Sequence, residues 1–404
     1  MDVASVAAQP TALYQWHIAH CSKSRLANFA GFLMPLWFGS IPAEYTAVRK
    51  AAGLFDCTHM GVMDVAGRDA AKFLNFIATN EIGRLADGVA QYSYILDEVG
   101  NVLDDIIVYR QGKERFMVVV NAANKAKIAA YVREKSEAKS EYKVAIRFLD
   151  TADAGADAKV DIALQGPVSA DVLGCLSGGA KKFAALKSFH FLRADVSGID
   201  VIIARTGYTG AKVGFELFVH PQKTVALWEL ILEKGRAFGV EPCGLGARDS
   251  LRIEAGLPLY GHELDGDYKI SPFEAGYGWA VKLEKDFFVG KDAMAKQAAE
   301  YAMEIVRLEL PGQKGIRPVR QNDGILDNDG RCVGWVTSCA GVGQSQIALA
   351  YVMRGVLKES QSVGAYYLAR SQGQIQQGKK KRVEKMEMLS ADLTGRVVSR
   401  FAKF

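Results

Sequence analysis

The chain has 404 residues, a length that exceeds a single ordinary hydrophobic core and predicts two or three domains. Hydrophobic residues make up 49% of it and only 10 residues are proline, a composition that excludes a disordered chain. The formal net charge of +5 is small for this length. It is compatible with an anionic ligand but does not indicate binding of nucleic acid.

The cysteines and the N-terminal segment predict a cytoplasmic location. Six cysteines occur without a CxxC motif, a spacing typical of reduced structural thiols. The first dozen residues lack the basic start and apolar run of a signal peptide and the arginines of a mitochondrial transit segment. No apolar stretch approaches the roughly 18 residues that cross a membrane. We therefore expect a soluble protein without a membrane partner.

The first 150 residues mix strands and helices. Residues 29–38 combine aromatic side chains with Gly and Pro and predict a packed loop. Residues 55–67 predict two short strands, and 69–79 a helix with apolar residues at helical spacing. Residues 91–110 predict a β-hairpin, and the segment Asn-Ala-Ala-Asn at 121–124 opens a helix after another strand. Strands with such connections predict an α+β domain.

The chain up to about residue 300 continues to mix strands and helices, and the rest predicts short strands. Residues 188–220 predict several antiparallel strands, and 224–239 and 244–256 predict helices. After about residue 300, short strands alternate with Gly-rich turns, which predicts a small β-barrel or sandwich followed by a polar, extended C-terminal tail.

Two adjacent aspartates, Asp104 and Asp105, interrupt the apolar strand NVLDDIIVYR. Side chains alternate along a strand, so Asp104 shares a face with Ile106 and Val108, and Asp105 shares the other face with Tyr109. A carboxylate in apolar surroundings is costly unless a partner or ligand meets it. A strand end where both carboxylates are wet explains the pattern equally well.

Three further polar residues have both a structural and a functional reading. Glu216 lies opposite to apolar neighbours in GFELFV, which is typical of a solvent-facing carboxylate or of one that grips an amidine-like edge. Arg248 stands near a helix start and requires an anion, which is Asp249, Glu254 or a ligand. Asn121 either caps the following helix or presents its amide to a ligand.

Motifs for several other chemistries are absent. His17 and His20 are too few for a metal site, so no metal is expected. The sequence has no GxxxxGK[ST], no GxGxxG after a strand, no GxSxG and no HExxH.

Seven blocks occur in an order that resembles the glycine-cleavage T-protein (aminomethyltransferase) family: HMG, QYSYILDEVGNVLDDIIVYR, VVNAAN, LQGP, RTGYTG with GFEL, GLGARDSLRIEAGLPLYGHELD and SPFEAGYGWAVKLEKDFFVGK. The resemblance covers residues 12–300. It implies an α+β, three-domain, cloverleaf-like folate-binding fold with a C-terminal small β-barrel. The implied domains are 1–60 with 145–300, then 61–144, then 301–404.

The resemblance also implies a cofactor, a partner and a site. Tetrahydrofolate is the expected cofactor, and a lipoylated carrier protein is the expected partner that donates an aminomethyl group. Asp105 is the implied catalytic residue. The implied folate-binding residues are Met60, Tyr92, Asn121, Tyr208, Glu216 and Arg248.

The sequence departs from the family pattern in GAKVGFE, in GNV before the two aspartates and in the C-terminal loop. These changes leave the implied folate pocket largely untouched, so the one-carbon donor is less firmly implied than the folate. A tetrahydrofolate-dependent demethylase, which takes its methyl group from a methylated small molecule, stays open. A non-catalytic relative in iron–sulfur assembly carries a KGCYxGQ motif that this chain lacks.

Overall fold

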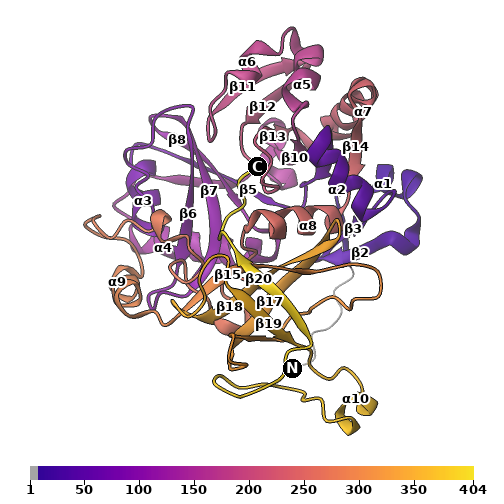
Figure 1. Cartoon of the computed structure of the whole chain (residues 1–404). Helices are drawn as coiled ribbons and strands as arrows, with labels where there is room; N and C mark the ends of the chain where they lie inside the picture. Colours follow the sequence, from indigo (N-terminus) through magenta and orange to yellow (C-terminus); the bar gives the residue numbers. More distant parts are fainter. Residues whose placement is uncertain (1–7) are drawn as a thin grey trace. The chain divides into compact units, whose positions relative to one another are not determined.

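The computed structural model describes residues 8–404, apart from the side chain of Ala152. The chain divides into two compact units. The first runs to Arg248 and includes Ala280–Lys291; the second consists of Asp249–Trp279 and Asp292–Phe404. Figure 1 traces the chain from indigo to yellow.

Three sheets form the first unit. The smallest has the order β1-β3-β2, and the two larger sheets have the orders β11-β12-β13-β10-β4-β14 and β6-β7-β8-β5-β9. In the six-stranded sheet the β14–β4 pair is parallel and the other pairs are antiparallel. The strands are β1 (Gln9–Pro10), β2 (Leu26–Phe29), β3 (Phe32–Pro35), β4 (Ala52–Asp56), β5 (Gly61–Ala66), β6 (Ala90–Leu96), β7 (Val102–Gly112), β8 (Arg115–Val120), β9 (Ala145–Phe148), β10 (Val160–Gln165), β11 (Phe191–Val196), β12 (Ile199–Ala204), β13 (Gly214–Val219) and β14 (Val240–Cys243).

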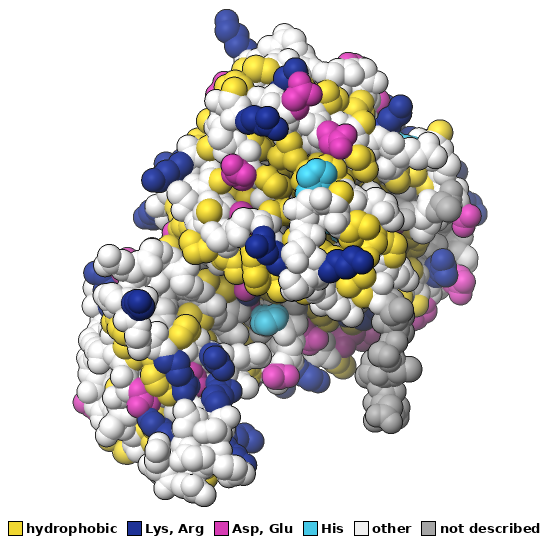
Figure 2. Space-filling view, turned by 90° about the vertical axis from the view of Figure 1, so that its right-hand side faces the viewer, with side chains coloured by type: hydrophobic (Ala, Val, Ile, Leu, Met, Phe, Trp, Pro, Cys, Tyr) yellow, Lys and Arg dark blue, Asp and Glu magenta, His cyan; other side chains and the backbone are white. Residues whose placement is uncertain are grey.

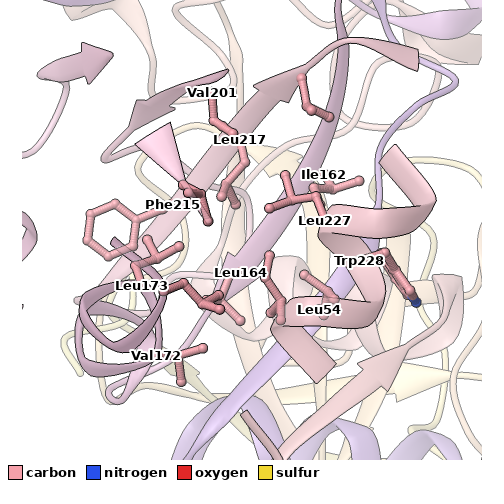
Figure 3. Close-up of a cluster of buried hydrophobic side chains, with 14 of the residues drawn as sticks. Leu54, Ile162, Leu164, Val172, Leu173, Val201, Phe215, Leu217, Leu227 and Trp228 are labelled. Carbon is pink, nitrogen blue, oxygen red and sulfur yellow. The ribbon is translucent and has the colours of Figure 1, made fainter. Parts of the chain in front are cut away.

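Helices α5 (Ser169–Ser177) and α7 (Thr224–Gly235) contribute to the core on one face of the six-stranded sheet. Figure 3 shows this core, in which strand residues such as Leu164 and Leu217 meet Leu173 of α5 and Trp228 of α7. These four side chains are fully buried. Alternate residues of β10 and β13 point into this core, so the intervening ones lie on the opposite face of the sheet.

The five-stranded sheet packs one face on helices α3 (Ala70–Ile77) and α4 (Lys125–Ala138) through apolar side chains such as Phe73, Val108 and Ile128. Its other face joins the six-stranded sheet in a second apolar cluster. The inner faces of the two large sheets therefore pack against each other.

The second unit contains a closed barrel with the strand order β15-β18-β17-β16-β19-β20. This confirms the prediction of mixed helices and sheets with a C-terminal barrel. The predicted polar tail was wrong in one respect, because β20 pairs with β15 and β19 and closes the barrel. The barrel strands are β15 (Met303–Pro311), β16 (Gly324–Leu326), β17 (Cys332–Val342), β18 (Ser345–Met353), β19 (Ser362–Tyr366) and β20 (Leu393–Val398).

The predicted loop at 29–38 was also wrong in part, because Leu26–Phe29 and Phe32–Pro35 form an antiparallel pair. Gly31, which has a φ of +85°, turns the chain between the two strands. The remaining helices are α1 (Tyr14–His20), α2 (Ile41–Lys50), α6 (Lys181–Ala184), α8 (Leu245–Ala255), α9 (Lys291–Glu300) and α10 (Gln372–Gln376).

The limits of the three predicted domains stay a prediction. Strand β9, at the start of the predicted segment 145–300, is an edge strand of the five-stranded sheet. Residues 1–7 of the first predicted domain lie outside the described residues.

The surface carries mixed charge. Figure 2 shows Lys and Arg side chains interspersed with Asp and Glu over the face that it draws. Within residues 8–404, no helix is long and apolar enough to span a membrane. The cytoplasmic location stays a prediction.

Truncation of Leu164 tests the core of the six-stranded sheet. We expect Leu164→Ala to lower the free energy of unfolding by about 2–5 kcal/mol, because the fully buried side chain leaves a cavity. Urea unfolding measures this loss. Val99→Ala is the control, since Val99 is 69% exposed and its truncation should change stability by less than about 0.5 kcal/mol. Equal effects of the two substitutions would contradict the assigned core.

Candidate active site

The two aspartates of β7 lie on opposite faces of the five-stranded sheet, as the alternation predicted. Asp104 is completely buried on the face that α3 and α4 cover, beside Ile106 and Val108. Asp105 is partly exposed and lies on the inner face with Ile107 and Tyr109. The alternative of a strand end with two wet carboxylates was wrong for Asp104.

Asn121 connects the two carboxylates. It follows β8, which pairs with β7, so its amide lies next to the aspartates. Its Nδ2 donates to Oδ1 of Asp104 at 2.8 Å and to Oδ1 of Asp105 at 2.7 Å, and its backbone N–H donates to Oδ2 of Asp104 at 3.0 Å. Asn124 adds a bond of 2.6 Å from its Nδ2 to Oδ1 of Asp104. The helix-cap reading of the Asn121 side chain was therefore wrong: it forms no cap hydrogen bond.

Tyr92 of β6 holds the second oxygen of Asp105. Its hydroxyl donates to Oδ2 of Asp105 at 2.9 Å, and its ring contacts that of Tyr94 edge to face at 5.2 Å. Both oxygens of Asp105 thus have a fixed donor, which sets the orientation of this carboxyl group on the inner face.

Burial governs the protonation of this aspartate pair. Loss of water around Asp104, and then the charge of Asp105, raise the pKa of Asp104 to about 8, although Asn121 and Asn124 donate to it. Burial also raises the pKa of Asp105, against the hydrogen bonds from Tyr92 and Asn121. Two adjacent carboxyl groups in such surroundings do not both ionise at neutral pH, so the pair retains a proton.

Glu216 lies on the inner face of β13 and is 9% exposed, so it is not the solvent-facing carboxylate that its pattern allowed. Its Oε2 accepts a hydrogen bond of 3.0 Å from the Tyr109 hydroxyl and another from the Thr206 hydroxyl. Among the described residues no donor meets Oε1. One oxygen is thereby anchored, and the other is available to a ligand.

Gln165 holds the loop that carries Thr206 and Tyr208. Its Nε2 donates to the backbone oxygen of Thr206 at 3.1 Å, and its Oε1 accepts from Thr209 at 2.9 Å. A Cβ on Gly207 would lie 2.0 Å from Oε1 of Gln165, so any residue but glycine would displace this hydrogen-bonded side chain. The LQGP and RTGYTG blocks therefore build one structure.

Arg248 does not pair with the carboxylates that the sequence suggested. Its Nη1 donates to Sγ of Cys57 at 3.2 Å, and its guanidinium carbon lies 5.2 Å from the ring centroid of Tyr208. Asp249 pairs with Arg252 instead. No ion pair of Arg248 occurs among residues 8–404, and its positive charge acts on Glu216 at longer range. Arg248 is thus a partly buried cation without an adjacent counter-ion.

The seven predicted site residues fall into contacting groups on the first unit. Asp105, Tyr92 and Asn121 form one group, Met60 packs on the apolar cluster between the sheets, and Tyr208 lies by Arg248. Glu216 connects to the face of Asp105 through Tyr109, four residues further along β7 and so about 13 Å away.

Sequence reasoning missed several residues of this site. Tyr109 and Thr206 anchor Glu216, and Asp104 orients Asn121. Asp161 lies in VDIALQ between residues that face the core, a pattern that resembles the two aspartates of β7. This pattern in the sequence could have identified Asp161 as a buried carboxylate. No sequence pattern indicated that Tyr109 and Thr206 contact Glu216.

His17 and His20 take structural roles. Nε2 of His17 lies 2.8 Å from Oδ2 of Asp56, and Nδ1 of His20 lies 2.8 Å from the backbone oxygen of Trp16. In the described part of the chain, no group of three or more His, Cys, Asp or Glu side chains is placed to hold a metal ion.

The chain is similar to known proteins over most of its length. The family model "GCVT N-terminal domain" matches residues 13–285. An aminomethyltransferase from Chlorobium chlorochromatii is 39% identical over 328 residues, which cover 81% of this chain and 85% of the relative. One from Halalkalibacterium halodurans is 40% identical over 316 residues, with 78% and 81% covered.

A solved structure is similar over nearly its whole length. The glycine cleavage system aminomethyltransferase T from Bartonella henselae superposes with a TM-score of 0.78, at 30% identity and with 97% of each chain covered. These relatives are aminomethyltransferases, so the fold and the family model together identify a group-transfer enzyme. The chain belongs to the glycine-cleavage T-protein family of aminomethyltransferases.

The raised pKa of Asp104 predicts how stability varies with pH. Between pH 4 and about 8 the folded protein binds more protons at this site than the unfolded chain, so its free energy of unfolding falls as pH rises. Asp104→Asn removes this titration. We expect the variant to gain stability relative to wild type from pH 5 to 8, by up to about 1.4 kcal/mol per pH unit.

Urea unfolding at several pH values measures this difference. Asp171→Asn is the matched control, since Asp171 is exposed on α5 and its replacement should leave a curve parallel to that of wild type. A parallel curve for Asp104→Asn as well would contradict the retained proton.

Proposed function

We propose that this aminomethyltransferase uses tetrahydrofolate and takes the methylene group from an aminomethyl-lipoyl carrier protein, with release of ammonia, as in glycine cleavage. One observation carries the proposal. The inner faces of two packed sheets hold Asp105, fixed by Tyr92 and Asn121, and Glu216, fixed by Tyr109 and Thr206. An elongated ligand is needed to reach both groups.

The side chains of the candidate site have the chemistry that binding of tetrahydrofolate requires. Glu216 has one anchored oxygen and one without a donor, and a carboxylate of this kind accepts from the N–H and NH₂ groups on the edge of a pterin ring. Arg248 lacks an adjacent counter-ion and suits an anionic group of the ligand. Met60 and Tyr208 offer polarisable and aromatic surfaces to a planar ring.

When bound, tetrahydrofolate supplies the two nitrogens that take up the methylene group as the carrier's sulfur and ammonia leave. The residues of this chain orient that reaction and stabilise charge. Asp105 presents a carboxyl group whose pKa is raised by burial, so it can hold or release a proton closer to neutral pH than an exposed aspartate. Tyr92 and Asn121 fix its two oxygens and hold it ready for positive charge that develops nearby.

The lipoylated carrier is proposed from the family relatives. The relative from Bartonella henselae is named a glycine cleavage system protein. Among the described residues of the first unit, no contact favours a demethylase that acts on a methylated small molecule, so that alternative is an outcome of the assay.

The decisive assay combines purified protein, tetrahydrofolate and an aminomethyl-loaded lipoylated carrier. We expect ammonia and 5,10-methylene-tetrahydrofolate to form in equal amounts. Formation of 5-methyl-tetrahydrofolate from a methylated small molecule, with no turnover of the carrier, would establish the demethylase instead.

Asp105→Asn tests the catalytic role of the carboxylate. The amide has nearly the same shape but carries neither charge nor a titrating proton. We expect kcat to fall about 30- to 1,000-fold, equivalent to about 2–4 kcal/mol of transition-state stabilisation. The same assay measures kcat, with Asp171→Asn as the control. Near-normal turnover of Asp105→Asn would remove Asp105 from the mechanism.

A further inference from the structure

Asp161 is a buried carboxyl group for which the proposed reaction gives no role. It lies in β10 between Val160 and Ile162, which both point into the core of the six-stranded sheet. Asp161 therefore points to the inner face, and it is only 2% exposed. Its Oδ1 has no hydrogen-bond partner among the described residues. A buried polar atom without a partner destabilises the protein, which makes this position a candidate for ligand binding.

The surroundings of Asp161 belong to the candidate site. Asp161 pairs with Phe218 across the β10–β13 ladder and Ala163 pairs with Glu216, so Asp161 and Glu216 are diagonal neighbours on the inner face. The charges that act on Asp161 are those of Glu216, Arg248 and Asp56. Asp56 has its own partner in His17, so Arg248 is the cation that acts on both Asp161 and Glu216.

This charge balance determines the form of Asp161. Burial, and next the negative charge of Glu216, raise the pKa of Asp161 far above its usual value, against the opposing effect of Arg248. A protonated carboxyl group has an O–H to donate, which an ionised one lacks. Glu216 differs from it, because its Oε2 already accepts hydrogen bonds from the Tyr109 and Thr206 hydroxyls.

We propose that Asp161 is a ligand-binding residue of this site, a neutral carboxylic acid that donates a hydrogen bond to an acceptor of the ring that Glu216 holds. The inference rests on the proposed function, since a 2-amino-4-oxopteridine ring carries N–H donors beside a carbonyl acceptor. Glu216 accepts from the donors, and Asp161 donates to the acceptor. The two carboxyl groups together then recognise the order of donors and acceptors on the ring.

This role predicts opposite effects on stability and on binding. Asp161→Leu replaces a buried carboxyl group, one of whose oxygens has no hydrogen-bond partner among the described residues, by an apolar side chain of similar size, so the free protein should unfold at the same or a higher temperature than wild type. The same variant should bind tetrahydrofolate at least tenfold more weakly. Asp161→Asn retains a neutral donor, so its dissociation constant should stay within threefold of wild type.

The experiment uses the full-length chain and anaerobic tetrahydrofolate. Isothermal titration calorimetry gives the dissociation constants, and scanning calorimetry without ligand gives the unfolding temperatures. Asp171→Asn on the exposed side of α5 is the control. A purely structural role of Asp161 would not produce weaker binding together with unchanged or higher stability, nor rescue of binding by Asn.

Each contrary result is distinct. Binding by Asp161→Asn as weak as that by Asp161→Leu would show that an ionised carboxylate is required and would overturn the neutral donor. Wild-type affinity in Asp161→Leu would overturn the binding role of Asp161 but not the proposed function. A lower unfolding temperature of the free Asp161→Leu variant would do the same. Wild-type protein that binds no tetrahydrofolate would overturn the proposed cofactor together with the ligand assigned to Asp161.

Discussion

The site depends on one amide group that reaches two carboxylates on opposite faces of a strand. The side chains of Asp104 and Asp105 point to opposite faces of the sheet, so only a group on or directly after a neighbouring strand, level with both, can contact the two carboxylates. Asn121 does so with a single Nδ2, and its backbone N–H fixes it on Asp104. The buried aspartate therefore orients the asparagine, and the asparagine orients the carboxyl group on the inner face. A Gln in place of Asn121 would not preserve this geometry, because its amide is one methylene further out.

The inner faces carry more acid than the local cation can balance. Asp161 and Glu216 lie near Arg248, and Asp105 of β7 is a further carboxyl group on the inner face. A protein selected for stability alone would replace such groups by apolar ones, since buried unpaired polar atoms lower the free energy of unfolding. Their presence is consistent with a ligand whose own donors and acceptors complete the hydrogen bonds.

Local sequence patterns were sufficient to predict much of the secondary structure and the faces of the two aspartates. The faces of Asp104 and Asp105 follow from a period of two, which depends on the backbone alone. The hairpin of β6 and β7 and the helix α8 followed from turn and helix signals. The partners of Glu216 did not, because Tyr109 is 107 residues away and meets it through the packing of two sheets. The hairpin of β2 and β3 was missed since its aromatic residues alternate too weakly to indicate a strand.

From the sequence alone followed the family, most of the strands and helices, and the residues that resemble a folate site, because motif blocks and periodicity are properties of neighbouring residues. The tertiary structure decided which carboxyl groups lose water and which donors meet them. In the folded chain, Asp249 pairs with Arg252 and not with Arg248, and the Tyr109 hydroxyl donates to Glu216. Oδ1 of Asp161 has no partner among the described residues. Burial and pairing arise from segments far apart in the chain, and protonation follows from both. Sequence patterns therefore identify candidate residues, and the packing of the fold determines which of them are protonated.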